Sequence, residues 1–133
     1  MPPVTITFTD RYAWGGAATN YNNRPYTWMR VHGPAGTYDL WALVDTGADY
    51  LMLETAVANS VGISLGNANT ITVNLAGGGT TSLQLVQNVR ITVEGKSANV
   101  DALFGSHGTP LLGRTAIIPA IDFGIDNIGW LYR

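Results

Sequence analysis

Short β-prone segments, separated by turns that contain glycine, recur along most of the chain. Apolar residues that alternate with polar ones, or short apolar runs, predict strands at residues 4–8, 25–31, 38–44, 50–53, 71–75, 80–85, 89–93, 100–104 and 129–132. Helical signals are few: residues 55–61 precede Gly62, and a short helix after Gly113 meets Pro119, which we expect to break it. Many short strands with so little helix predict an all-β fold, either a closed or a sandwich-like barrel.

The composition limits what such a barrel can be. With 133 residues, 46% of them apolar and 12% charged, the chain is expected to fold as one domain over residues 1–133. The net charge of −2 and the absence of basic runs argue against a nucleic-acid partner. The absence of cysteine excludes disulfides and thiol catalysis.

The N-terminal part differs in composition from the rest of the chain. Residues 11–24 are rich in glycine and asparagine and predict a loop, so residues 1–24 are expected to form an N-terminal arm or a pro-segment. The first ten residues lack the layout of a signal peptide, and no apolar run is long enough to span a membrane. We therefore expect no membrane contact, and a cytoplasmic location if the chain is full length.

One apolar strand leads directly into a polar cluster, in the sequence LWALVDTGADYLMLE at residues 40–54. Asp45 follows Leu43 and Val44, which we expect to be buried, and an unpaired buried carboxylate is costly. The carboxylate must therefore be paired, hydrogen-bonded or neutral. One interpretation is a simple β-turn in which Asp45 bonds to its own backbone, because such turns are common. A bare Asp-Thr-Gly sequence cannot decide between this turn and a catalytic site.

Two further motifs accompany this turn. Three consecutive glycines, Gly77 to Gly79, follow Leu75 and Ala76 at the tip of a predicted hairpin. The sequence Leu111-Leu112-Gly113-Arg114 precedes the second predicted helix, which Thr115 is expected to cap. The two histidines lack the spacing of a metal site, and Ser106-His107 lacks a nucleophile elbow, so we expect no metal, no cofactor and no serine hydrolase.

The three motifs together resemble the retropepsin-like aspartic proteases, the single-domain family that includes the retroviral proteases. The resemblance rests on residues 45–49 (DTGAD), residues 77–79 and residues 111–114 (LLGR), and it covers about residues 37–126. It implies an acid-protease half-barrel with a glycine-rich flap hairpin and a short C-terminal helix. It also implies aspartic endopeptidase activity, in which two carboxylates activate a water molecule without a metal or a cofactor.

The chain contains this Asp-Thr-Gly motif once, although the mechanism needs two carboxylates. Asp122-Phe123-Gly124 lacks the threonine or serine and follows the LLGR motif. The resemblance therefore implies a C2 homodimer in which Asp45 of each subunit meets at the symmetry axis. It further implies that the Thr46 hydroxyl bonds across that axis and that the Gly47 carbonyl binds the substrate backbone.

The remaining expected roles concern substrate binding and support. The resemblance implies contacts with the substrate from Ala48, Asp49 and the hairpin tip (Ala76, Gly77, Gly78 and Gly79). It also implies a partly buried ion pair between Asp49 and Arg114, with Leu112 and Gly113 as support. Four apolar residues are candidate pocket walls that favour hydrophobic side chains around the scissile bond, with plain core as the alternative: Leu43, Met52, Leu75 and Leu111.

Two alternatives remain open at this level. The first is the same fold without catalysis, acting as a module for peptide binding or dimerisation. The second, outside the family, is a β-barrel that binds a ligand and in which the Asp-Thr-Gly sequence is only a turn.

Overall fold

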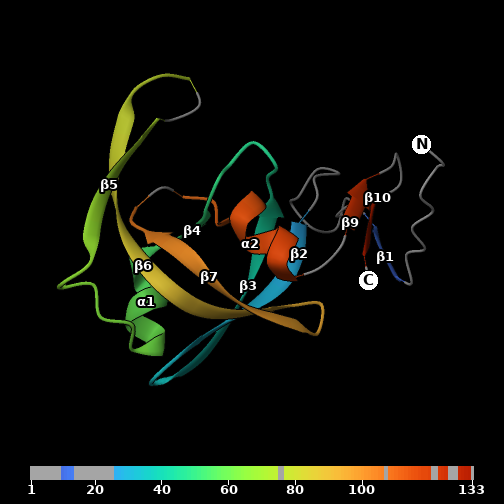
Figure 1. Cartoon of the computed structure of the whole chain (residues 1–133), viewed down its shortest axis with the longest axis horizontal. Helices are drawn as coiled ribbons and strands as arrows, with labels where there is room; N and C mark the ends of the chain where they lie inside the picture. Colours follow the sequence, from blue (N-terminus) through green and yellow to red (C-terminus); the bar gives the residue numbers. More distant parts are fainter. Residues whose placement is uncertain are drawn as a thin grey trace, which may run out of the picture.

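The structure, a computed structural model, is built mainly from β-strands (Figure 1). It describes residues 10–13, 26–74, 77–106, 108–120, 123–125 and 129–132. Its elements, in chain order, are β1 (Asp10–Ala13), β2 (Tyr26–Gly33), β3 (Gly36–Val44), β4 (Leu51–Leu53), α1 (Thr55–Val61), β5 (Asn69–Asn74), β6 (Thr80–Val93), β7 (Lys96–Phe104), β8 (Leu111–Leu112), α2 (Arg114–Ala120), β9 (Phe123–Ile125) and β10 (Gly129–Tyr132). The expected all-β class is confirmed.

The larger sheet closes on itself. Its strand order is β2-β3-β8-β4-β7-β6-β5, and β2 also pairs with β6. Six strands therefore form a ring, and β5 lies outside it as an edge strand that pairs with β6. A ring of this kind leaves few strand edges without a hydrogen-bonded neighbour. The backbone N–H and C=O groups are therefore paired between strands, although the chain contains little helix.

Alternating burial along the strands produces the core. In β2 the side chains of Met29 and Val31 are buried, whereas those of Trp28 and Arg30 point outward. β3 follows the same rule and buries Leu40, Ala42 and Val44. Burial of each large aliphatic side chain stabilises the fold by about 1.5–3 kcal/mol. This alternation therefore fixes which face of each strand packs in the core and which face remains accessible to other molecules.

The first helix has the predicted bounds. It covers Thr55–Val61 and ends at Gly62, whose φ of 78° lies in the left-handed region that favours glycine. Val57, Ala58 and Val61 are buried against the sheet. The helix packs mainly on β2 and β3, near the turn between them. None of the helices in the described ranges is long and apolar enough to cross a membrane.

Three predicted elements differ from the structure. Residues 80–85 and 89–93, predicted as two strands, belong to one long strand, β6. The pairing of β6 with β7 shifts its register at a bulge between Val86 and Val89, and the strand continues beyond this bulge. The second helix includes Pro119 and ends one residue later, since the proline ring is compatible with helical φ and costs one hydrogen bond.

The third difference lies near the N-terminus. Residues 11–13 are not loop but part of β1, which pairs with β10 in a three-stranded sheet of order β1-β10-β9. The strand predicted at residues 4–8 and the rest of the predicted loop, residues 14–24, lie outside the described residues. Residues 10–13 are thus tied to the C-terminal strand β10 by backbone pairing.

Candidate active site

Asp45 is the first residue after β3, a strand of the closed sheet. β3 runs parallel to β8, with Leu43 opposite Leu111 and Val44 opposite Leu112. The backbone N–H of Asp45 donates to the Leu112 carbonyl at 3.1 Å, which extends this pairing by one residue. Val44 and Leu112 are buried in the core, so they hold the backbone that leads into Asp45 in one position.

The turn after β3 holds the Asp45 carboxylate. The N–H of Gly47 donates to Asp45 Oδ1 at 2.9 Å, and the N–H of Ala48 donates to the Asp45 carbonyl at 3.1 Å. The local turn bond that the sequence allows is therefore present. The Asp45 side chain is half-buried, whereas Thr46 and Gly47 are exposed. The arrangement presents an oriented carboxylate at an open edge of the barrel.

The LLGR motif braces the far side of this turn. The N–H of Arg114 donates to the Ala48 carbonyl at 2.9 Å. A Cβ atom on Gly113 would lie 2.8 Å from the Ala48 carbonyl oxygen and even closer to that of Tyr50, so only glycine fits there. The two motifs, far apart in the sequence, form one packed unit.

Thr115 adds a contact that the sequence did not indicate. Its N–H and its hydroxyl both donate to the Asp49 carbonyl, at 3.0 Å and 2.6 Å. Thr115 therefore lies inside α2 and bonds to the loop, instead of capping the helix as expected. The only sequence feature that singled out Thr115 was its position directly after the LLGR motif. That position did not indicate this hydrogen bond, because the accepting Asp49 carbonyl belongs to a distant part of the sequence.

Asp49 and Arg114 form an ion pair, in which the Arg114 guanidinium donates to Asp49 Oδ1. Both side chains are more than half exposed in the single chain, 64% for Asp49 and 54% for Arg114, where the sequence suggested partial burial. Exposed ion pairs stabilise proteins by about 0–1 kcal/mol. The backbone bonds around Gly113 consequently contribute more to the brace than this pair does.

Three of the four candidate pocket residues lie side by side. Leu111 is the register partner of Leu43 on β3 and of Met52 on β4, and all three side chains are half-buried. Register partners point to the same face of a sheet, so these residues form an apolar row next to Asp45. Leu75 and Ala76 lie outside the described residues.

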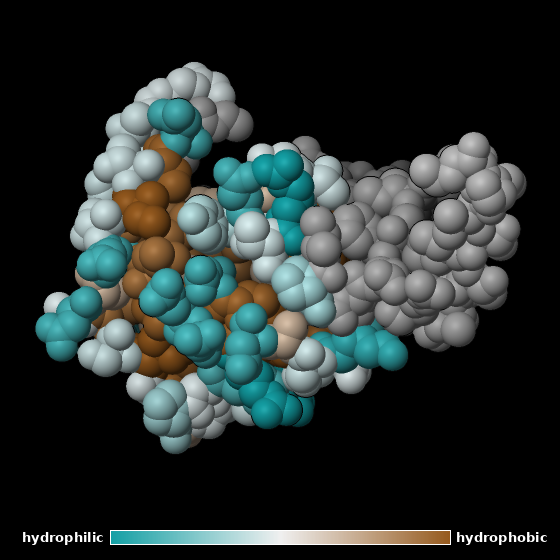
Figure 2. Space-filling model, viewed as in Figure 1, coloured by the Kyte–Doolittle hydropathy of each residue, from teal (hydrophilic) through white to brown (hydrophobic). Residues whose placement is uncertain are grey.

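The glycine tip projects from the barrel on the same side as the 45–50 loop (Figure 1). Gly77, Gly78 and Gly79 all have positive φ, and apart from their chain neighbours no heavy atom lies within 4 Å of a Cβ placed on any of them. Apolar surface lies along the hairpin that carries them (Figure 2). Its β5 strand contributes the half-buried Ile71 and Val73. The Asp45 side chain is not within 4 Å of a Cβ placed on Gly77, Gly78 or Gly79.

The described ranges contain no group of three or more His, Asp or Glu side chains that could hold a metal ion. A carboxylate in an oriented turn, next to an apolar row, is compatible with acid–base chemistry on a bound peptide.

The sequence profile of a family described as aspartyl protease matches residues 29–116, which are 88 of the 133 residues. The chain belongs to the aspartyl protease family. The matched segment includes both the Asp45 turn and Gly113, and the family is of the retropepsin-like type. No curated protein sequence matches the chain.

Membership of the aspartyl protease family decides between two of the earlier interpretations. A β-barrel outside the family, with an incidental Asp-Thr-Gly turn, is excluded by the match. The choice between a catalytic and a non-catalytic member of the family depends on what Asp45 does.

Proposed function

We propose that this aspartyl protease family member is an active endopeptidase whose catalytic centre forms between two copies of the chain. The observation that carries the proposal is the single Asp-Thr-Gly turn, held by Gly47 on one side and by the LLGR motif on the other. Such a turn supplies one oriented carboxylate. Hydrolysis by this chemistry needs two, and a second copy is the simplest source.

The proposed reaction divides two tasks between the two Asp45 carboxylates. Two carboxylates that share a proton cannot both ionise easily, so one is a base and the other an acid. The ionised carboxylate takes a proton from a bound water, whose oxygen attacks the scissile carbonyl carbon. The protonated carboxylate gives its proton to the carbonyl oxygen. As the tetrahedral intermediate collapses, the carboxyl that took the water proton gives it to the leaving nitrogen. The other carboxylate takes a proton from a hydroxyl of the intermediate, the C–N bond breaks, and both groups return to their starting states.

The neighbouring residues of the turn have supporting roles in this proposal. Thr46 is exposed next to Asp45, where its hydroxyl is available for a bond to the partner subunit. The Gly47 carbonyl, Ala48 and Asp49 would bind the substrate backbone. Arg114, Leu112 and Gly113 keep this loop in place, which fits the backbone bonds that join the two motifs.

The proposed substrate is a peptide or protein segment with hydrophobic side chains around the scissile bond. The apolar row of Leu43, Met52 and Leu111 next to Asp45 supports this preference. The hairpin tip at Gly77 to Gly79, with Leu75 and Ala76, would act as the flap over the bound segment.

The non-catalytic alternative keeps the fold, the dimer and peptide binding but not cleavage. No observation on the described residues favours it over catalysis. The two functions differ in one measurable property, which is the effect of removing the Asp45 charge.

The test is cleavage of a diverse peptide library by the wild-type chain and by Asp45→Asn. Loss of the acid–base pair is expected to lower cleavage by at least about 10²–10⁴-fold. Circular dichroism and sedimentation should show an unchanged fold and dimer. Cleavage by the wild type that survives in Asp45→Asn would contradict the proposed role of Asp45. Binding of peptides without any cleavage between about pH 3 and 7 would support the non-catalytic module instead.

A further inference from the structure

Strand β6 changes its neighbour part-way along its length. Its residues 80–85 pair with β5, and its residues 90–93 pair with β2. Between these two stretches, no described strand pairs with residues 86–89 on this side of β6. The backbone N–H and C=O groups that face this gap are therefore open to an added peptide, as at the edge of a sheet.

A bulge distorts the same stretch of β6. Between Val86 and Val89, β6 carries one residue more than the paired segment of β7. Asn88 has a φ of 57°, in the left-handed region that is uncommon for residues other than glycine. Bulges are frequent beside functional sites, where they redirect side chains, and the side chains of Gln87 and Asn88 are exposed here.

A shallow pocket of about 320 Å³ opens at this gap. Its walls come from the end of β2 and the turn after it, from Ile63 beyond α1, and from residues 86–90 of β6. Ile63 and Val86 are half-buried and pack against the core, and Val89 is part of the core itself. The floor of the pocket is therefore apolar, and its rim is polar, as in many ligand sites.

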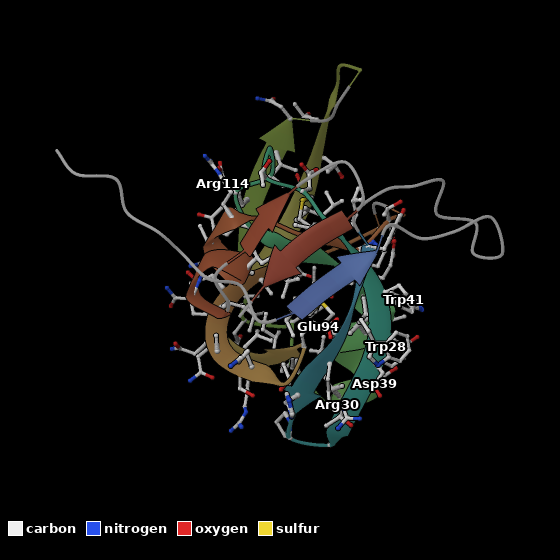
Figure 3. The ribbon with its side chains drawn as sticks, turned by 90° about the vertical axis from the view of Figure 1, so that its right-hand side faces the viewer. Trp28, Arg30, Asp39, Trp41, Glu94 and Arg114 are labelled. Atoms are coloured by element: carbon white, nitrogen blue, oxygen red, sulfur yellow. The ribbon has the colours of Figure 1, made fainter. Side chains whose placement is uncertain are left out.

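The lining carries one positive charge and no carboxylate. Burial, together with Arg90 and Arg30, lowers the pKa of the lining residue His32, so this histidine is uncharged at neutral pH. Arg30 is bound to Asp39 by two hydrogen bonds, at 2.7 Å and 3.0 Å (Figure 3). The exposed guanidinium of Arg90, in contrast, makes no hydrogen bond or ion pair with the described residues. The net charge of the lining is therefore +1.

We propose that this pocket binds the C-terminal residue of a peptide that ends in a branched apolar side chain. The side chain would lie on Ile63 and Val86, and the terminal carboxylate would face Arg90, whose planar guanidinium matches a carboxylate with two parallel hydrogen bonds. The last peptide group would bond to the open backbone of residues 86–89. The inference does not depend on the proposed proteolysis.

A peptide C-terminus is the ligand that uses all three features of the pocket. A free apolar acid has the carboxylate and the apolar chain but no amide for the backbone of residues 86–89. An internal peptide segment has the amide and the side chain but leaves Arg90 without an anion. These two ligands therefore serve as comparisons in the test.

The test is a titration of the full chain, labelled with ¹⁵N, followed by the backbone amide resonances of residues 86–90. The probe is N-acetyl-leucine, and N-acetyl-leucinamide is the matched probe without charge. We expect N-acetyl-leucine to shift these resonances with a millimolar Kd and to bind at least about threefold more tightly than the amide. N-acetyl-alanine keeps the carboxylate but loses most of the apolar chain, and should bind at least about threefold more weakly than N-acetyl-leucine.

Two pairs of variants separate binding from structural effects. Arg90→Gln should weaken N-acetyl-leucine about threefold to tenfold and leave the amide probe unchanged. Lys96→Gln is its control, because it removes an exposed cation that does not line the pocket. Val86→Thr keeps the shape of the floor but adds a hydroxyl, and should weaken both leucine probes. Its control is Val73→Thr, at a half-buried valine of β5 outside the pocket.

Four results would overturn the proposal. The first is equal affinity for N-acetyl-leucine and its amide, and the second is unchanged binding of N-acetyl-leucine to Arg90→Gln. The third is binding of isocaproate, which has the same carbon skeleton without the amide, as tight as that of N-acetyl-leucine; the pocket would then be a site for free apolar acids. The fourth is no shift at residues 86–90 with N-acetyl-leucine up to about 50 mM, far above the Kd expected for a single residue.

Discussion

Two loops rise from the same side of the barrel, and they differ in how the rest of the chain holds them (Figure 1). The 45–50 loop receives backbone bonds from Arg114 and Thr115 and packs against Gly113 so closely that a Cβ atom has no room. The tip at Gly77 to Gly79 has open space around every Cβ position. The first loop fixes a carboxylate, whereas the second has no heavy atom within 4 Å of its Cβ positions, a division that suits the proposed site, with a rigid floor and a movable cover.

The largest effect is expected from Gly113→Ala, because the new methyl group would clash with the backbone carbonyls of Ala48 and Tyr50. Overpacking against backbone costs about 2–3 kcal/mol. The displaced loop should also lose peptide cleavage. Urea unfolding and library cleavage measure the two effects. Gly66→Ala is the control, since the nearest atom to its Cβ position is 4.0 Å away. A Gly113→Ala protein as stable as this control would show that the loop is not braced as described.

Thr115→Val tests the brace at a single hydrogen bond. The substitution keeps the shape but removes the hydroxyl that donates to the Asp49 carbonyl. A hydrogen bond of this kind contributes about 1 kcal/mol, which urea unfolding can measure. Thr115→Ser should restore most of the loss because it returns the donor. Equal stability of the valine and serine variants would mean that the hydroxyl bond contributes nothing.

The contrast between the two loops also shows what the sequence could reveal. Local patterns predicted α1 and β10 with their observed bounds, and the three consecutive glycines indicated the open tip. The pairing of β2 with β6, which closes the barrel, joins segments about 60 residues apart, and no local pattern predicts such a pairing. The role of Thr115 was missed for the same reason, since its acceptor is the carbonyl of Asp49, 66 residues earlier in the chain. The sequence alone indicated the two motifs that meet at the 45–50 loop, but not the hydrogen bonds that hold this loop.

Gly78→Ala probes the free loop and should have a smaller effect on stability. The φ of 99° would strain an alanine by roughly 1–2 kcal/mol in a fixed backbone. Because no heavy atom of the described structure lies within 4 Å of the Gly78 Cβ position, the hairpin has room to readjust, and we expect the measured loss in urea unfolding to stay below about 1 kcal/mol. The kcat and KM of cleavage report separately on closure over the peptide. A loss as large as that of Gly113→Ala would show that the tip is packed in solution, for example against a second subunit.

The ion pair of Arg30 with Asp39 lies on the β2–β3 hairpin, away from both loops, and serves as the comparison for the exposed pair of Asp49 with Arg114. Its two bonds lower the pKa of Asp39, so its contribution to stability is present at neutral pH and is lost as the pH falls through the folded value. A double-mutant cycle with Arg30→Ala and Asp39→Ala should give a coupling that is measurable at pH 7 and that disappears in acid. Coupling that persists in acid would mean that the pair acts by packing and not by charge.

The smallest effect is expected from Arg114→Ala, because the ion pair with Asp49 is exposed in the single chain. A double-mutant cycle with Asp49→Ala should give a coupling of about 0.5 kcal/mol or less in urea unfolding of the dilute protein. The outcome bears directly on how the proposed site is assembled. Removal of one partner of a desolvated pair costs about 3–5 kcal/mol, so a coupling of that order would mean that a second subunit buries the pair. A coupling that grows with protein concentration would identify that subunit as another copy of this chain.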